Sequence, residues 1–343
     1  MAGKWLGRVA LAALTLAGLG SGAVGQTTNL RAQTGAPGST GFIFMTAMQS
    51  VLQKHLPVQI NITTGAAATR STLDATRGNV DLFTSAPSIN YFMSSKTAMF
   101  KDMADAPEKF KKHVRSILNY PLGPYHIIVY ESSGIKELAD MKGKKAFIGP
   151  PGGAATVVAL AIIEGATGYK ANVDYQQVRL DWNSGQQAFQ DKQVDIAIFP
   201  TELPSPMVAQ FALLDKIRLI TIPEKAFSAP AMKKTLSLPG RTIMEIAPGT
   251  YGKNQVNDSS VKAVGSWIGL STRTEMDEEM IYKITKTIFE NIKDIHAAAP
   301  FLKEITKETA LLQMNAPLHK GALRYYREIG LKIDPSLVPP EAK

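Results

Sequence analysis

The sequence predicts an α/β fold in which helices flank parallel or mixed sheets. Two observations predict it. Short β-rich runs recur along the chain, at residues 58–62, 80–83, 126–130, 145–148, 194–199 and 217–222. Helical patterns lie between them, at residues 44–54, 69–77, 155–164 and 185–190. Alternating strands and helices are typical of α/β units, in which a helix carries the chain from one strand to the next.

Residues 1–25 match a cleavable signal peptide. Lys4 and Arg8 form a short, positively charged N-terminal region. An apolar run over residues 9–19 follows, and residues 23–25 fit a signal-peptidase site. An uncleaved anchor is the alternative, but the run is shorter than the roughly 20 residues that a spanning helix needs. We therefore expect a protein exported to the periplasm of a Gram-negative cell.

The chain of 343 residues contains no cysteine. This composition excludes a disulfide framework, thiolate metal sites and a cysteine nucleophile. The length suggests about two domains. Lys and Arg number 38 against 29 Asp and Glu, but the basic residues are scattered. Because nucleic-acid binding needs a basic stripe or a known motif, we expect no nucleic-acid partner.

Five loops rich in glycine, serine and threonine follow expected strands or precede expected helices. They lie at residues 33–41, 63–70, 84–88, 149–155 and 200–204. Ligands of α/β proteins bind beyond the carboxyl ends of strands, and helix N-termini attract anions. One such loop alone is more often a tight turn. Five together predict a crevice for a small anionic ligand.

The last third of the sequence is more helical. Thr274 and Asp277 match a capping box, with Thr274 as the N-cap and Asp277 at the third helical position. Apolar residues then recur every four positions, as on a buried helix face, at Met276, Met280, Ile284, Ile288 and Ile292. A core-facing helix is therefore expected to begin after Thr274.

The sequence offers no clear catalytic motif. Residues 35–41 lack the following Lys-Ser/Thr of a phosphate-binding loop. The serine within residues 265–269 is one position away from a nucleophile elbow. No two of the five histidines stand at metal-ligand spacing. We expect no enzyme, no catalytic residue, no metal site and no cofactor.

Residues 277–292 and 317–330, together with 133–145, carry a resemblance that covers nearly all of the expected mature chain. The sequence resembles the TAXI-type solute receptors of TRAP transporters, which are periplasmic solute-binding proteins. It departs from that family at Lys320, where proline is usual, and at Arg70, where asparagine is usual. In two loops, alanines stand where the family usually has glycine or a residue with a hydroxyl group. The family's ligand therefore cannot simply be assigned to this chain.

The resemblance implies a two-lobed, type II-like binding-protein fold with a ligand cleft at the hinge between the lobes. Lobe 1 would comprise residues 27–133 plus 244–343, and lobe 2 residues 134–243. The hinge would pass through residues 119–130 and 244–252. The lobes would close around the ligand.

We hypothesise a role for each candidate site residue. Arg70 would pair with a ligand carboxylate through its planar guanidinium, unless it is a surface arginine. Glu202 would accept from an ammonium or hydroxyl, unless it is a solvated loop carboxylate. Hydroxyl donors would be Ser39, Thr40, Thr64 and Ser85. Backbone N–H donors would be Gly152, Gly153 and Ala154. The cleft walls would be Tyr125 and Trp182.

The resemblance implies a function as well. A monomeric receptor would capture a small anionic organic solute and deliver it to a TRAP-type membrane permease. The solute would be a glutamate-like amino acid or a 2-oxo or dicarboxylic acid. Two alternatives stay open. One is a ligand-sensing domain that partners a membrane sensor kinase, and the other is an exported hydrolase.

Overall fold

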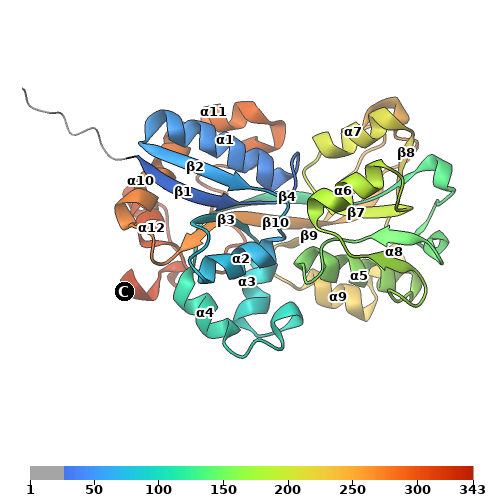
Figure 1. Cartoon of the computed structure of the whole chain (residues 1–343), viewed down its shortest axis with the longest axis horizontal. Helices are drawn as coiled ribbons and strands as arrows, with labels where there is room; N and C mark the ends of the chain where they lie inside the picture. The colour runs from blue at the N-terminus through green and yellow to red at the C-terminus, as the bar shows by residue number, and fades with distance from the viewer. Residues whose placement is uncertain (1–26, 343) are drawn as a thin grey trace, which may run out of the picture.

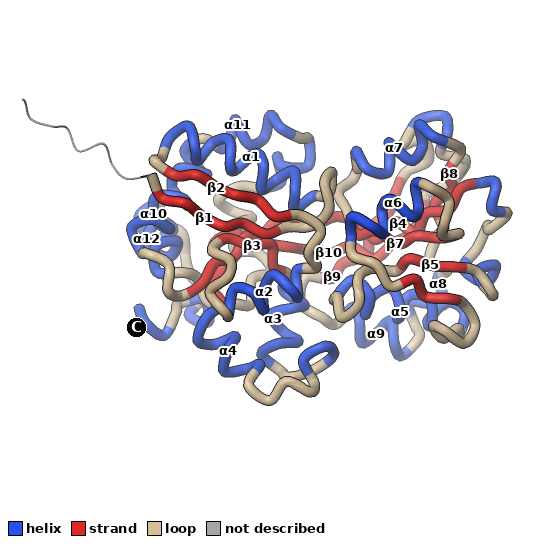
Figure 2. The backbone as a smooth tube through the Cα atoms, viewed as in Figure 1, coloured by secondary structure: helices blue, strands red, loops and turns tan. Residues whose placement is uncertain are grey.

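The computed structural model describes residues 27–342, in which one continuous mixed sheet runs through two lobes (Figures 1 and 2). The expected signal peptide lies outside the described residues. The strands are β1 (Thr28–Gln33), β2 (Val58–Thr63), β3 (Leu82–Ser85), β4 (Val114–Tyr130), β5 (Lys145–Phe147), β6 (Gln176–Val178), β7 (Ile196–Pro200), β8 (Ile217–Leu219), β9 (Arg241–Ile246) and β10 (Val261–Arg273).

Helices cover both faces of this sheet (Figure 1). In the first lobe, α1 and α11 lie on one face, and α2, α3 and α4 lie on the other. The helices are α1 (Thr40–His55), α2 (Ala68–Thr76), α3 (Pro87–Ser94), α4 (Ala106–His113), α5 (Ala154–Thr167), α6 (Trp182–Gln190), α7 (Pro206–Leu214), α8 (Glu224–Phe227), α9 (Pro230–Leu236), α10 (Glu278–Glu290), α11 (Ile292–Ala298) and α12 (Lys320–Glu328). The predicted α/β class with helix-flanked mixed sheets is confirmed.

The strand order is β2-β1-β3-β10-β4-β7-β5-β6, with β8 beside β4 and β9 beside β10. Parallel pairs join β1 to β2 and β3, and β5 to β6 and β7. Antiparallel pairs join β10 to β3, β4 and β9. The long strand β10, which comes late in the chain, therefore lies between β3 and β4.

Two long strands connect the lobes. In β4, Leu118 packs in the first lobe's core, whereas Ile127 packs in the second lobe's core. In β10, Leu270 packs in the first core and Val264 in the second. Because both strands belong to both lobes, a hinge motion would bend them where they cross between the cores.

The residues around β9 pack with the second lobe. Ile246, Tyr251 and Val261 share a core with β7 and β8. The division into residues 27–133 plus 244–343 and 134–243 stays a prediction. These contacts favour a second lobe boundary inside β10.

Helix α10, in the last third of the chain, begins later than the sequence pattern predicted. Asp277, and not Thr274, is its N-cap, because the Asp277 carboxylate accepts from the Met280 N–H at 2.8 Å. The Thr274 N–H instead donates to the carbonyl of His113 at 3.0 Å. The helix buries a face that includes Ile281, Ile284, Ile288 and Phe289. The expected helix start at Thr274 was therefore wrong by three residues.

Candidate functional site

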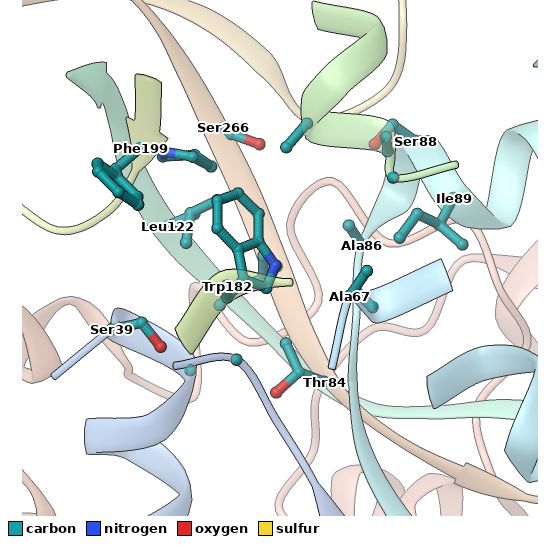
Figure 3. Close-up of a pocket in the computed structure, with 18 of the residues that line it drawn as sticks. Ser39, Ala67, Thr84, Ala86, Ser88, Ile89, Leu122, Trp182, Phe199 and Ser266 are labelled. Carbon is teal, nitrogen blue, oxygen red and sulfur yellow. The ribbon is translucent and has the colours of Figure 1, made fainter. Parts of the chain in front are cut away.

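A cavity of about 110 Å³ lies where β4 and β10 pass between the lobes (Figure 3). Leu122 and Tyr125 of β4 and Ser266 and Ile268 of β10 line it. All five predicted loops contribute lining residues, from Gly35 in the loop after β1 to Pro200 at the end of β7. The structure therefore brings together loops that are far apart in the sequence.

Helix N-termini converge on this cavity. Five helices, α1, α2, α3, α5 and α7, begin at its wall, and none of them has a side-chain hydrogen bond at its N-cap. Their first-turn lining residues are Gly41, Ala68, Ser88, Ala154 and Met207. The first N–H groups of a helix have no partner within the helix and carry partial positive charge. This arrangement favours an anion.

Arg241, the first residue of β9, is the one charged residue among the described residues that line the cavity. Its guanidinium donates to the Ser88 hydroxyl at 2.9 Å and to the Tyr125 hydroxyl at 3.3 Å, and it also contacts the Ser266 hydroxyl. Arg241 Nε is buried and has no partner within residues 27–342. A cation held by neutral hydroxyls is ready to pair with an incoming anion.

No carboxylate of the described chain lies within 4.0 Å of the Arg241 guanidinium. The guanidinium carbon lies 5.6 Å from the centre of the Tyr125 ring. Burial raises the pKa of the Tyr125 hydroxyl, and the nearby Arg241 charge partly opposes that shift. Tyr125 is therefore a neutral hydroxyl at physiological pH, able to donate or accept beside Arg241.

Some of the predicted site residues line the cavity. They are Ser39, Tyr125, Gly153, Ala154 and Trp182. Ser39 is the N-cap residue of α1, and its hydroxyl is buried without a partner in the described chain. Figure 3 shows the Trp182 indole in the middle of the ring of labelled residues, with Leu122 and Phe199 on one side.

The other predicted site residues do not line the cavity. Arg70 is paired with Asp74 at 2.8 Å, and its side chain is 67% exposed. Ser85 is buried and donates to Asn90 Oδ1 at 3.0 Å. Gly152 is exposed and Thr64 is partly buried. Ligand contact by these residues stays a prediction, and none of them lies at the cavity wall.

Glu202 and Thr40 form a buried contact between the lobes. Glu202 Oε2 accepts from the Thr201 hydroxyl at 2.6 Å and contacts the Thr40 hydroxyl. Glu202 Oε1 is buried and has no partner in the described chain. Burial raises the pKa of the Glu202 carboxyl, although hydrogen bonds from Thr201 and Thr40 oppose the shift. Glu202 therefore ties lobe 2 to the start of α1.

The sequence pattern did not reveal Arg241. It stands on an edge strand next to a Pro239-Gly240 turn, and no local motif marks it as a ligand group. Gly240 has φ +75°, and its N–H donates to Gln313 Oε1 at 3.0 Å, so the turn is fixed from a distant segment. Only the sheet register, which pairs Arg241 with Ser266, carries Arg241 to the cavity.

Residues 27–342 contain neither a candidate membrane-spanning helix nor a candidate metal site. No helix in this range is both long and apolar enough to cross a membrane. No cluster of three or more His, Asp or Glu side chains in this range has the arrangement of a metal site.

Solved structures with low sequence identity resemble the chain. A periplasmic transporter is 14% identical, with 88% of this chain and 93% of that chain covered and a TM-score of 0.50. The alkanesulfonate-binding protein SsuA from Xanthomonas axonopodis pv. citri, bound to MOPS, is 15% identical, with 89% and 91% covered and a TM-score of 0.45. A TRAP periplasmic solute-binding protein from Shewanella oneidensis, with bound succinate, is 8% identical, with 88% and 91% covered and a TM-score of 0.47.

The first of these likenesses shows that this chain shares its two-lobed α/β fold with that periplasmic transporter. The amino-acid sequence also matches a protein-family model, described as the NMT1-like family, over residues 32–330. Since this range spans most of both lobes, the chain belongs to the NMT1-like family.

Proposed function

We propose that the protein is a solute-binding receptor that captures a small organic anion in the cavity between its lobes. One observation carries the proposal. Arg241 faces the cavity without a carboxylate partner in the described chain, among helix N-termini that have no side-chain caps. A guanidinium pairs with an acid group through two parallel hydrogen bonds, and helix N–H groups stabilise the same charge.

Closure of the two lobes would trap the solute. The lobes already touch at Thr40 and Glu202, and a Cβ on Gly65 would lie 2.7 Å from Asn183 Nδ2 of the other lobe. These contacts bring the lobes together beside the cavity. A solute stabilises this closed state to the extent that it binds the closed state more tightly than the open one.

The finer assignment is a periplasmic receptor of the TAXI type. The signal-peptide pattern of residues 1–25 supports export, and residues 277–292 and 317–330 support the TAXI resemblance. The closed, loaded monomer would then deliver its solute to a TRAP-type membrane permease. Glutamate-like amino acids, 2-oxo acids and dicarboxylic acids are the solutes that this resemblance implies.

A thermal-shift screen tests the binding function. The full chain is expressed with its N-terminal segment, purified, and unfolded and refolded to remove any copurified solute. Amino acids, 2-oxo acids, dicarboxylates, monocarboxylates and sulfonates are then added. A ligand at 100 times its Kd stabilises the protein by about 2.7 kcal/mol, which a melting curve resolves. If none of these anions shifts the melting temperature, the proposal fails.

Two arginine variants locate the anion. Arg241→Ala should abolish the shift, since truncating one partner of a buried charge pair costs about 2–5 kcal/mol of binding. Arg70→Ala is the matched control, because Arg70 is exposed and already paired with Asp74. A shift that is lost in Arg70→Ala but kept in Arg241→Ala would place the anion outside this cavity.

A further inference from the structure

The wall of the cavity carries one positive charge. Among the described residues that line it, Arg241 is the one charged side chain and none is a carboxylate. Glu202, the acid that sequence analysis offered to an ammonium group, does not line the cavity, and its Oε2 is occupied by Thr201 and Thr40. An ammonium group would therefore meet helix N-termini and a guanidinium, which repel it, and no counter-charge.

The rest of the wall is mostly apolar. Large apolar side chains come from both lobes and from the connecting strands, namely Ile89, Leu122, Trp182, Phe199, Met207 and Ile268. In Figure 3 the Trp182 indole occupies the middle of the ring of labelled residues, with Phe199 and Leu122 to one side and Ile89 to the other. Contact with such a wall removes the apolar surface of a ligand from water, which makes the binding free energy more favourable.

A second acid group would find poorer partners than the first. Within the described lining there is one guanidinium, and the other side-chain donors, such as the Ser39 hydroxyl and the Trp182 indole N–H, are neutral. A second carboxylate would lose its hydration beside apolar walls with no second cation to replace it. The cavity therefore suits one negative charge.

We propose that the solute is a monoanionic organic acid with an apolar body, whose acid group pairs with Arg241 and whose body lies against Trp182. This inference rests on the proposed function and narrows it. It ranks α-amino acids and dicarboxylic acids below monoacids of the same carbon skeleton. A carboxylate and a sulfonate both suit the guanidinium, because each presents two oxygens to its fork.

Matched ligand pairs test the inference by titration calorimetry on the refolded full chain. We expect 3-phenylpropanoate to bind at least tenfold more tightly than phenylalanine, which adds only the ammonium group. We expect hexanoate to bind at least tenfold more tightly than adipate, which has a second carboxylate in place of the terminal methyl group. Binding of hexanesulfonate in place of hexanoate supports the inference equally. Tighter binding of phenylalanine, adipate or glutamate than of the matched monoacids overturns it.

Chain length and the tryptophan give a second, independent readout. Each buried methylene should raise the affinity about fourfold. Hexanoate has two more methylenes than butanoate and should therefore bind at least about tenfold more tightly. Trp182→Ala should weaken hexanoate binding at least tenfold. Leu213→Ala is the control, because Leu213 is 83% exposed and away from the lining. Unchanged hexanoate affinity in a folded Trp182→Ala protein overturns the inference.

The two proposals fail in different ways. If glutamate or a dicarboxylate binds best and Arg241→Ala abolishes that binding, the receptor function stands and the apolar-acid inference is overturned. If no acid of any class binds to the refolded protein, the receptor function itself is overturned, and the inference falls with it.

Discussion

Thr40, at the start of α1, and Glu202, in the loop after β7, are joined by contacts in both directions. The Glu202 N–H donates to Thr40 Oγ1 at 2.8 Å, and the Thr40 hydroxyl also contacts Glu202 Oε2. The same hydroxyl lies 3.0 Å from the carbonyl oxygen of Leu122. Because a threonine hydroxyl has only one proton, it donates to one of these oxygens at a time. A protonated Glu202 would supply the missing proton.

The stability of the protein should therefore depend on pH through Glu202. Burial raises the pKa of Glu202 above its ordinary value of 4.5. The folded protein then holds this proton more tightly than the unfolded chain does. The resulting stabilisation is fully present below pH 4.5 and is lost as the pH rises through the raised value.

Glu202→Gln tests this dependence, because glutamine keeps the shape and has no charge. We expect the variant to be about as stable as the wild type at low pH and about 1–3 kcal/mol more stable at neutral pH. Chemical unfolding at a series of pH values measures the difference, in which the other titrating groups cancel. Tyr120 and Tyr251, the titratable groups whose pKa values Glu202 affects, stay neutral over this range. Parallel stability profiles would refute the assignment.

Gly123 allows the loop after β7 to approach β4. It has φ +110°, and a Cβ there would overlap the carbonyl oxygen of Thr201 and lie 2.8 Å from the Glu202 Cα. Gly123→Ala should therefore destabilise the protein by about 2–4 kcal/mol, from backbone strain and overpacking together. The measurement is the free energy of unfolding in urea.

Gly134→Ala is the matched control for Gly123→Ala. Gly134 has φ +73°, but no atom of residues 27–342 lies within 4 Å of a Cβ placed on it. Only the left-handed backbone penalty of about 1–2 kcal/mol should remain there. Equal losses at the two positions would mean that the approach of the Glu202 loop to β4 contributes nothing.

Much of the fold was predictable because its buried strands have strong local signals. Residues 194–199 form an apolar run, and the structure has β7 there. The strand β10 was missed, because Gly265, Ser266 and Gly269 interrupt its apolar pattern. Its pairing with β3, β4 and β9 makes it a strand, and pairing partners are not visible in a local pattern.

At the start of α10, two candidate N-cap residues lie three positions apart, and only Asp277 caps the helix. Asp277→Ala should cost about 1 kcal/mol, since the Asp277 carboxylate holds the Met280 N–H. Thr274→Ala should change stability by less than about 0.5 kcal/mol, because the Thr274 hydroxyl has no partner in the described chain. Thermal unfolding of both variants measures this. A larger loss in Thr274→Ala would restore the capping box that the sequence suggested.

The candidate site was predictable in its loops but not in its cation. A strand followed by a Gly-rich turn and a helix is a local pattern, so Gly153 and Ala154 could be found by reading along the chain. Arg241 is held at the cavity by contacts with the Ser88 and Ser266 hydroxyls, and only the folded chain brings these residues together. Sequence reading selected Arg70 because it follows such a loop, yet its guanidinium is already paired with Asp74.

Solute binding should be visible in the fluorescence of one tryptophan. The chain has three tryptophans, and Trp5 belongs to the segment expected to be removed on export. Trp182 lines the cavity, whereas Trp267 does not. A bound solute should exclude water from the Trp182 indole and change its emission. Trp182→Phe should retain an apolar wall and binding within about tenfold by calorimetry, yet lose most of the emission change.

Trp267→Phe is the control for this assignment, since Trp267 lies on β10 where the strand crosses between the lobes. If the emission change persists in Trp267→Phe and disappears in Trp182→Phe, the solute contacts the Trp182 wall. The opposite pattern would mean that the signal comes from bending of β10 at the hinge. The solute would then change the lobe arrangement without touching Trp182. The emission of Trp267, on a hinge strand, is sensitive to lobe closure, whereas the emission of Trp182, at the cavity wall, is sensitive to solute contact.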